Sequence, residues 1–262
     1  MDLDQIHRGA VAAAFAGAKV LKEHFGNLTH IGKKGRTDLV TEADTTSERV
    51  IVDLLRSRFP DHSILAEEGS RISGSGRGLW IIDPLDGTTN YAHGLSLFAV
   101  SIGFAVEDIL MAGVVLNPMS GEMFSAVKGH GAQLNGSSIG VSRASKLADS
   151  LLVTGFPYNL EPVMGEVTQR FSRCLKAARG IRRLGAAALD LCYVACGRFD
   201  GFWEQYLNPW DTAAGVLIAN EAGATTTNFS NQAFRLDQKE ILSTNGHIHD
   251  EMIRLLNAED DA

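Results

Sequence analysis

The stretch that decides the fold reads Trp80-Ile81-Ile82-Asp83-Pro84-Leu85-Asp86-Gly87-Thr88-Thr89-Asn90. An apolar strand ends abruptly at a carboxylate, a proline fixes the turn and removes a backbone donor, and a second carboxylate follows three residues after the first. Two carboxylates so close in sequence repel each other unless a cation lies between them, and hard oxygen ligands of this kind suit Mg²⁺ or Mn²⁺. The stretch therefore predicts a strand, an acidic turn that binds metal, and the start of a helix.

Other residues of this turn point to the same chemistry. Pro84 would hold the Leu85 carbonyl in a fixed direction, so this backbone oxygen is a candidate third ligand. Gly87 lets the backbone approach a ligand closely, and the free N–H groups of Gly87 and Thr88 at a helix start favour a bound anion. In a simpler interpretation, the two aspartates only cap a helix and solvate a turn. That explains one carboxylate but leaves the other at the end of an apolar strand, where its burial is costly.

The composition limits the classes of function that the chain can have. The 262 residues are 45% hydrophobic and 21% charged, which suits one large globular domain or two small ones. A net charge of −7 argues against sequence-blind binding to nucleic acid or to an anionic membrane. No apolar run is long enough for a membrane helix, and Asp2 and Asp4 stand where a secretory signal would be positive. We therefore expect a cytoplasmic protein without a membrane or nucleic-acid partner.

The order of the expected elements divides the chain into two halves. Residues 1–145 read as helices followed by consecutive strands, typical of an α+β layer, and this half holds most of the acidic candidates. Residues 146–262 read as alternating strands and helices, typical of an α/β layer. This second half contributes Glu204, at the end of a predicted strand, and Asp211, which we expect to be the N-cap of a helix.

Two segments before the central stretch carry further acidic candidates. Glu42-Ala43-Asp44 opens a predicted helix, and Thr45 with Glu48 would form its capping box. From spacing alone, capping is the better explanation of Asp44. A short predicted strand ends in Glu67-Glu68-Gly69, a pattern that usually marks an exposed turn.

Continued through Tyr91-Ala92-His93-Gly94, the central stretch resembles the signature of the inositol monophosphatase family of Mg²⁺-dependent, lithium-sensitive phosphomonoesterases. Trp210 to Gly215 matches the family's second motif, Trp-Asp-x-Ala-Ala-Gly. A third motif, Lys-x-x-x-x-Asp-x-Val-Thr-x-x-Asp, is matched from Lys33 to Asp44. The resemblance covers roughly Ile6 to Met252. It implies the layered αβαβα sandwich that this family shares with fructose-1,6-bisphosphatase, and a homodimer.

The resemblance also implies roles for individual residues. Two or three Mg²⁺ ions, or Mn²⁺ in their place, would be held by Glu67, Asp83, the Leu85 carbonyl, Asp86 and Asp211. Catalysis would depend on Glu67, on Thr88 and on Asp44 hydrogen-bonded to Thr88, while Lys33 and Asp38 would line a flap. Substrate would contact Asp86, Gly87, Thr88, Gly185, Ala187, Glu204 and Asp211. Ala186 replaces a hydroxyl residue common in the family, a departure that weakens one polar contact.

These motifs lead us to expect hydrolysis of a phosphate monoester by metal-activated water, with myo-inositol 1-phosphate as the substrate. Fructose 1,6-bisphosphate, or another sugar or nucleotide phosphate of the same superfamily, remains the alternative; the run from Gly87 to Tyr91 resembles the inositol-phosphate branch. A different class of function is a binding scaffold for a macromolecular partner. Intact acidic positions argue against an inactive enzyme, because carboxylates clustered without metal cost stability.

Overall fold

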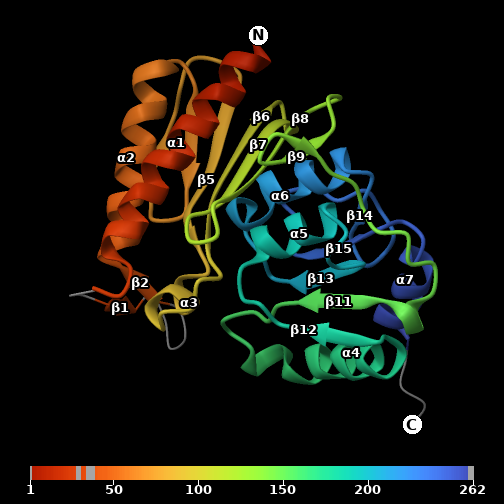
Figure 1. Cartoon of the computed structure of the whole chain (residues 1–262). Helices are drawn as coiled ribbons and strands as arrows, with labels where there is room; N and C mark the ends of the chain where they lie inside the picture. Colours follow the sequence, from red (N-terminus) through yellow and green to blue (C-terminus); the bar gives the residue numbers. More distant parts are fainter. Residues whose placement is uncertain (1, 28–30, 34–38, 259–262) are drawn as a thin grey trace.

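The computed structural model describes residues 2–27, 31–33 and 39–258, which form the αβαβα sandwich that the family resemblance implies (Figure 1). The outer layer on one side consists of α1 (Leu3–His24) and α2 (Glu42–Arg58). Between the two sheets lie α5 (Ala187–Ala195) and α6 (Pro209–Glu221), and the outer layer on the other side consists of α4 (Met164–Ala177) and α7 (His249–Asn257). Across the described residues, 2–27, 31–33 and 39–258, no helix combines the length and the apolar character that a membrane span requires.

The described residues of the first half form an eight-stranded sheet in the order β10-β9-β8-β7-β6-β5-β3-β4. Its strands are β3 (Ser63–Ala66), β4 (Arg71–Ile72), β5 (Gly78–Asp86), β6 (Ala99–Val106), β7 (Ile109–Asn117), β8 (Glu122–Val127), β9 (Ala132–Leu134) and β10 (Ser137–Ser138). Neighbouring strands are antiparallel except β3 and β5, which run parallel. The segments that follow β3 and β5 therefore leave the same edge of the sheet. The short helix α3 (Thr88–Ala92) follows β5, and β1 (Ile31–Lys33) pairs with β2 (Leu39–Thr41).

The second sheet has the order β12-β11-β13-β15-β14. Its strands are β11 (Leu151–Thr154), β12 (Gly180–Arg182), β13 (Gly201–Gln205), β14 (Thr225–Thr227) and β15 (Glu240–Thr244). The first three strands are parallel, and β15 runs antiparallel to both β13 and β14. Although the two sheets come from the two predicted halves, α6 of the second half packs on β6 and β7 of the first. The division into two domains at residues 145 and 146 stays a prediction.

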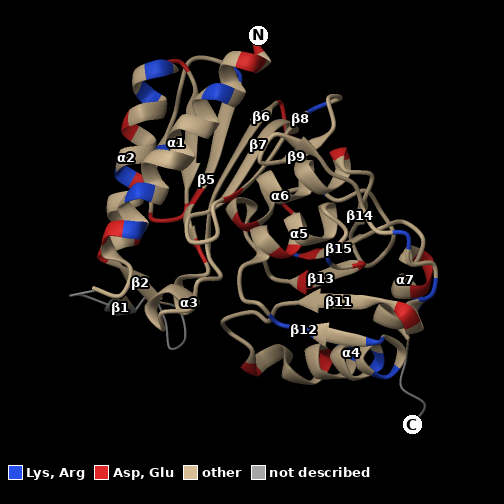
Figure 2. Cartoon of the chain, viewed as in Figure 1, with Lys and Arg blue, Asp and Glu red and all other residues tan. Residues whose placement is uncertain are grey.

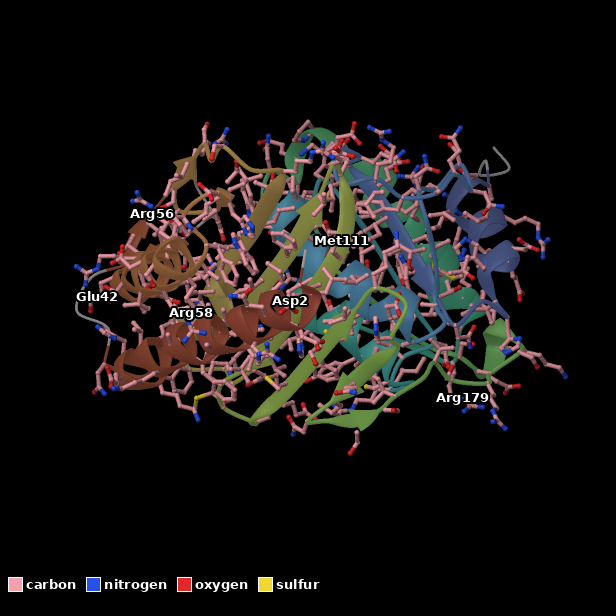
Figure 3. All side chains as sticks on the ribbon, turned by 90° about the horizontal axis from the view of Figure 1, so that it is seen from above. Asp2, Glu42, Arg56, Arg58, Met111 and Arg179 are labelled. Carbon is pink, nitrogen blue, oxygen red and sulfur yellow. The ribbon has the colours of Figure 1, made fainter. Side chains whose placement is uncertain are left out.

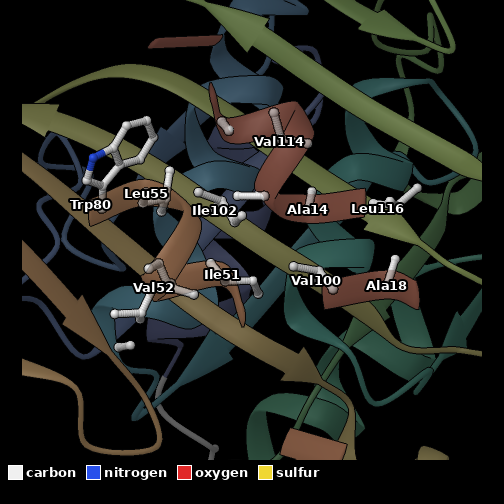
Figure 4. Close-up of a cluster of buried hydrophobic side chains, with 14 of the residues drawn as sticks. Ala14, Ala18, Ile51, Val52, Leu55, Trp80, Val100, Ile102, Val114 and Leu116 are labelled. Atoms are coloured by element: carbon white, nitrogen blue, oxygen red, sulfur yellow. The ribbon is translucent and has the colours of Figure 1, made fainter. Parts of the chain in front are cut away.

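Small and branched side chains explain how the first layers pack (Figure 4). Ala14 and Ala18 of α1 and Ile51 and Leu55 of α2 are buried against the large sheet. A Cβ atom at Gly17 would lie 2.6 Å from the Cδ1 atom of Ile51, so the missing side chain allows α1 and α2 to approach closely. This packing holds α2 against the strands whose ends form the candidate site.

Helix α2 begins at Glu42 and Asp44 takes part in its cap, as predicted, but the predicted capping box is wrong. The capping box joins Thr41 to Asp44, not Thr45 to Glu48: Thr41 is the N-cap, and the Asp44 Oδ2 atom accepts the Thr41 N–H at 2.8 Å. Capping one turn earlier leaves Glu48 on the buried face of the helix, with 4% of its surface exposed. The exposed side chains of α2, such as Arg56, lie at the periphery of the molecule (Figure 3).

The start of α6 corrects a second expectation. Asp211 is not the N-cap but the third residue of the helix, because Asn208 is the N-cap and Pro209 occupies the first helical position. Proline is favoured there, since its fixed φ suits a helix and its missing N–H would have no partner. The Asp211 Oδ2 atom accepts the Asn208 N–H at 2.7 Å, which completes a capping box.

Candidate active site

A pocket lies where the ends of β3 and β5 face the amino ends of α5 and α6. Its volume is about 120 Å³. Its wall includes every residue predicted to hold metal and every predicted substrate contact: Glu67, Asp83, Leu85, Asp86, Gly87, Thr88, Gly185, Ala187, Glu204 and Asp211. The fold thus brings together acidic positions that lie in four separate segments of the sequence.

The parallel pairing of β3 and β5 explains why Glu67 lies beside the Asp-Pro-Leu-Asp segment, Asp83 to Asp86. Glu67 directly follows β3, and its N–H donates to the Ile82 carbonyl at 3.2 Å, one residue before Asp83. This segment is not the predicted turn but the bulged end of β5, where the pairing with β6 shifts register between Asp83 and Asp86. Within it, the Asp83 Oδ1 atom accepts the Leu85 N–H at 3.0 Å across the proline. This local bond fixes the direction in which the Asp83 carboxylate enters the pocket.

Asp86 links the first sheet to a helix of the second half. Its Oδ2 atom accepts the Ala188 N–H at 2.8 Å, in the first turn of α5. The N-cap of α5 is Ala186, which has no side chain able to cap the helix. The Asp86 carboxylate takes over this task, and the partial positive charge of the helix start favours its ionised form.

Asp211 reaches the pocket because α6 packs against the sheet beside β5. The Ser101 Oγ atom donates to the Trp210 carbonyl at 3.4 Å, and Ser101 is the β6 partner of Asp83 in the sheet. A Cβ atom at Gly103 would lie 2.8 Å from the Ala213 Cβ atom, so the glycine permits the close approach of α6. The first turn of α6 is therefore fixed next to the end of β5.

The acidic side chains of the pocket destabilise one another's charged forms. Burial, and then the charges of Glu67, Asp86 and Asp211, hold the pKa of Asp83 well above its usual range. The pKa of Asp86 is raised to about 7, mainly by burial, and burial likewise raises the pKa of Asp211. Figure 2 shows acidic positions gathered between the two sheets, while many Lys and Arg positions lie on the outer helices.

A divalent cation would relieve this repulsion, and the donor set fits one. Glu67, Asp83, Asp86, Asp211 and the Leu85 carbonyl offer only oxygen atoms, which Mg²⁺ and Mn²⁺ prefer. Within residues 2–27, 31–33 and 39–258, no three His, Cys, Asp or Glu side chains already form a cage tight enough to hold a metal. The fit to a cation therefore rests on the chemistry of the donors and on their mutual repulsion.

Thr88 and Asp44 form the hydrogen bond that the family resemblance implies. The Thr88 Oγ1 atom lies 3.1 Å from Asp44 Oδ1 and 3.1 Å from the Leu85 carbonyl oxygen. Asp44 has no exposed surface, and burial raises its pKa to about 6, although hydrogen bonds from Thr41 and Thr88 lower it. Asp44 does not line the pocket itself but lies behind Thr88.

Glycines leave room for close contacts around the pocket. Gly87 and Gly185 have φ values of +94° and +91°, in the left-handed region that favours glycine. Glu204, at the end of β13, is 8% exposed, and burial raises its pKa to about 8 against the opposing effect of Arg183. A Cβ atom at Gly155 would lie 2.1 Å from a Glu204 carboxylate oxygen, so Gly155 leaves room for this side chain.

The structure also shows pocket residues to which the sequence gave no role, and leaves two predictions outside its range. Arg183, Gln205 and Tyr206 line the pocket. In the sequence Arg183 is one of three neighbouring arginines, with Arg179 and Arg182, and Glu204, with which it interacts electrostatically, is 21 residues away. The side chain of Lys33 and the whole of Asp38, predicted to line the flap, lie outside the described residues.

Comparisons with known proteins agree with this geometry. Residues 2–260 match the inositol monophosphatase family. The inositol-1-monophosphatase of Synechocystis sp. is 44% identical over 249 residues, which cover 94% of this chain and 86% of that protein. The Nus factor SuhB of Pseudomonas aeruginosa is 44% identical over 224 residues, which cover 84% of this chain and 83% of that protein.

Solved structures give the same result. The crystal structure of the extragenic suppressor protein suhB from Bartonella henselae has a TM-score of 0.93 at 38% identity, and the match covers 96% of this chain and 98% of that one. Sequence, architecture and pocket therefore agree: the chain belongs to the inositol monophosphatase family and is an enzyme that hydrolyses phosphate monoesters.

Proposed function

We propose that the enzyme hydrolyses myo-inositol 1-phosphate to inositol and phosphate with the help of Mg²⁺. The observation that carries this proposal is that Glu67, Asp83, Asp86 and Asp211 line a single pocket together with Leu85. Glu67, Asp83, Asp86, Asp211 and the Leu85 carbonyl would hold two or three Mg²⁺ ions, with Mn²⁺ as a possible substitute. Bound metal would supply positive charge that stabilises the phosphoryl oxygens, and it would make water a better nucleophile at neutral pH.

Thr88 and Asp44 are suited to orient the attacking water. A threonine hydroxyl has one proton, so it donates either to Asp44 or to the Leu85 carbonyl at one time. Donation to Asp44 leaves the lone pairs of Oγ1 free to accept a hydrogen bond from water. Glu67 would receive the proton that this water loses as its oxygen bonds to phosphorus. The phosphorus–oxygen ester bond breaks, and the alcohol leaves with a proton from solvent.

The size of the pocket favours a compact substrate. Its volume of about 120 Å³ lies below the roughly 300–1,000 Å³ of pockets that enclose drug-sized ligands. Glu204 is placed to accept hydrogen bonds from substrate hydroxyls, while the backbone at Gly185 and Ala187 would border the ring. Acceptors of this kind select a polyol, because an analogue without hydroxyls leaves a buried carboxylate without partners.

A neighbouring cavity favours fructose 1,6-bisphosphate, or another sugar or nucleotide phosphate, as the second candidate. This cavity of about 430 Å³ shares Phe156, Tyr158 and Arg183 with the pocket. A larger ester could extend into it and bring a second phosphate to the Arg183 guanidinium, which recognises phosphate well. The similarity to a Nus factor supports a role as a binding scaffold for a macromolecular partner, beside catalysis.

Phosphate release from inositol 1-phosphate, fructose 1,6-bisphosphate, 3′-phosphoadenosine 5′-phosphate, histidinol phosphate and NADP at fixed Mg²⁺ tests the proposal. We expect the highest kcat/KM for inositol 1-phosphate, and inhibition by lithium. A better turnover of another ester would overturn the substrate assignment but not the metal site. Gel filtration and cell fractionation would test the predictions of a homodimer and of a cytoplasmic location.

A further inference from the structure

We infer that Glu48, on the buried face of α2, is a positioning residue that holds the Glu67 turn in the geometry needed for metal binding. The inference rests on the proposed function, because it takes Glu67 as a metal ligand. Glu48 lines no part of the pocket and contacts neither metal nor substrate in this proposal. Its effect would be transmitted through the backbone on either side of Glu67.

The hydrogen bonds of Glu48 lead directly to this turn. One carboxylate oxygen accepts the Glu68 N–H at 2.6 Å, and the other accepts the Ser70 N–H at 3.0 Å. The turn is closed on its other side by the Ala66 N–H, which donates to the Ser70 carbonyl at 2.9 Å. Glu48 therefore holds Glu68, the residue that follows Glu67. The two ends of the turn, Ala66 and Ser70, are joined by their own hydrogen bond.

Glu48 is one of three polar residues on the same buried face of α2. Asp44, Ser47 and Glu48 are three and four residues apart, so they lie on one side of the helix. Their exposed fractions are 0%, 0% and 4%. Asp44 accepts from Thr88, and the Ser47 Oγ atom donates to the Pro84 carbonyl at 3.0 Å.

Each of these contacts ends on a different segment of the pocket. Asp44 holds the start of α3, Ser47 holds the Asp-Pro-Leu-Asp end of β5, and Glu48 holds the turn after β3. Polar side chains therefore occupy positions on the buried face of α2 where apolar side chains would be expected. Their hydrogen bonds fix the relative positions of three pocket segments. The helix therefore acts as a rigid support on which the pocket segments are aligned.

Glu48→Gln is the sharpest test, because it keeps the size of the side chain. Only one of its two terminal atoms can accept a hydrogen bond, so the amide group would face one backbone N–H with another donor. Removing a group that orients a metal ligand typically weakens metal binding about 10–100-fold. We expect a loss of this size in the affinity for Mn²⁺, measured by electron paramagnetic resonance on the full chain.

The matched control is Glu221 of α6, which also holds two backbone N–H groups. Its carboxylate accepts from Gly129 at 2.7 Å and from Gly131 at 2.8 Å, in a loop that does not line the pocket. Glu221→Gln should leave Mn²⁺ affinity within about twofold of wild type, whatever it does to the unfolding temperature. If Glu48 had only a structural role, Glu48→Gln and Glu221→Gln would have similar Mn²⁺ affinities.

Two further readouts keep the test decisive. Amide hydrogen exchange of Glu68 and Ser70 should accelerate in Glu48→Gln, and raised Mg²⁺ should restore most of its turnover because binding, not chemistry, is weakened. If Glu48→Gln does not fold, Glu48→Asp takes its place, with a smaller loss of about 3–10-fold because the charge remains. Wild-type affinity in the folded variant would overturn the inference alone. A wild-type chain that binds no Mn²⁺ would overturn it together with the proposed function.

Discussion

Gly155→Ala should impair catalysis through Glu204 while leaving the fold almost unchanged. An added Cβ atom would lie 2.1 and 2.2 Å from the two carboxylate oxygens of Glu204, far inside an ordinary contact of 3.4 Å. The carboxylate would have to move by roughly 1 Å to restore that contact. It is the far end of a flexible side chain that lines the pocket, so it can move into the pocket instead of displacing β13.

The expected magnitude follows from the proposed contact with substrate. Leaving the partner of a buried hydrogen bond unsatisfied costs about 1–3 kcal/mol. Each 1.4 kcal/mol corresponds to a factor of about ten. Loss of one such bond between Glu204 and a substrate hydroxyl should therefore lower kcat/KM about 5- to 150-fold. The unfolding free energy should change by less than about 1 kcal/mol, because no packed backbone has to shift.

The assay is steady-state phosphate release from inositol 1-phosphate at saturating Mg²⁺, with urea unfolding of the same samples. Gly165→Ala is the matched control, because a Cβ atom at this α4 position meets nothing within 4 Å. Glu204→Gln should also reduce kcat/KM, and adding Gly155→Ala to it should cost little more, since both changes remove the same contact. A Gly155→Ala enzyme with wild-type kcat/KM would refute the reasoning.

Three other predictions follow from the same geometry. Asp86→Asn should lose more than about 100-fold of its Mg²⁺-supported turnover but keep a cooperative unfolding transition by circular dichroism; an active variant would contradict the metal assignment. Gly103→Ala places a methyl group 2.8 Å from the Ala213 Cβ atom and should lower the unfolding free energy by about 1–3 kcal/mol in urea, so an unchanged midpoint would count against the packing argument. Burial lowers the pKa of His249 below its ordinary 6.5, so only the unfolded chain gains this proton as the pH first falls below about 6.5, and stability is lost in that window. His249→Gln should be less stable than wild type at pH 7.5, and urea titrations at pH 7.5, 6.5 and 5.5 should show the gap shrinking; a constant gap would show that His249 does not titrate this way.

The sequence predicted most of the strand and helix pattern because the relevant signals are local. The apolar run before Asp83 gives β5, although this strand continues through a bulge to Asp86 and does not end in a turn at Asp83 as predicted. The strands Glu122–Val127 and Leu151–Thr154 have the predicted bounds. The layered architecture came from the family resemblance, and the structure confirms it. Periodicity alone left open which helix would cover which face of a sheet, since that depends on contacts between distant segments.

The two wrong caps show where local patterns fail. Thr41 with Asp44 and Thr45 with Glu48 both have capping-box spacing, and only the tertiary structure separates them. The Glu48 carboxylate accepts a hydrogen bond from Glu68, 20 residues away, and does not cap the helix. Thr41 and Asp44 form the capping box instead. The three-and-four spacing of Asp44, Ser47 and Glu48 on the apolar face of α2 was the one sequence signal that could have revealed this.

Asp86 has a structural role as well as its proposed role in metal binding. Its carboxylate lines the pocket and also takes the place of the missing cap at the start of α5, which lies between the two sheets. An asparagine at this position keeps an oxygen that can accept the Ala188 N–H but removes the charge that would bind metal. An alanine removes both, and loss of a cap costs about 0.5–2 kcal/mol. The asparagine variant therefore isolates the catalytic contribution, whereas loss of activity in an alanine variant would mix metal binding with the docking of α5.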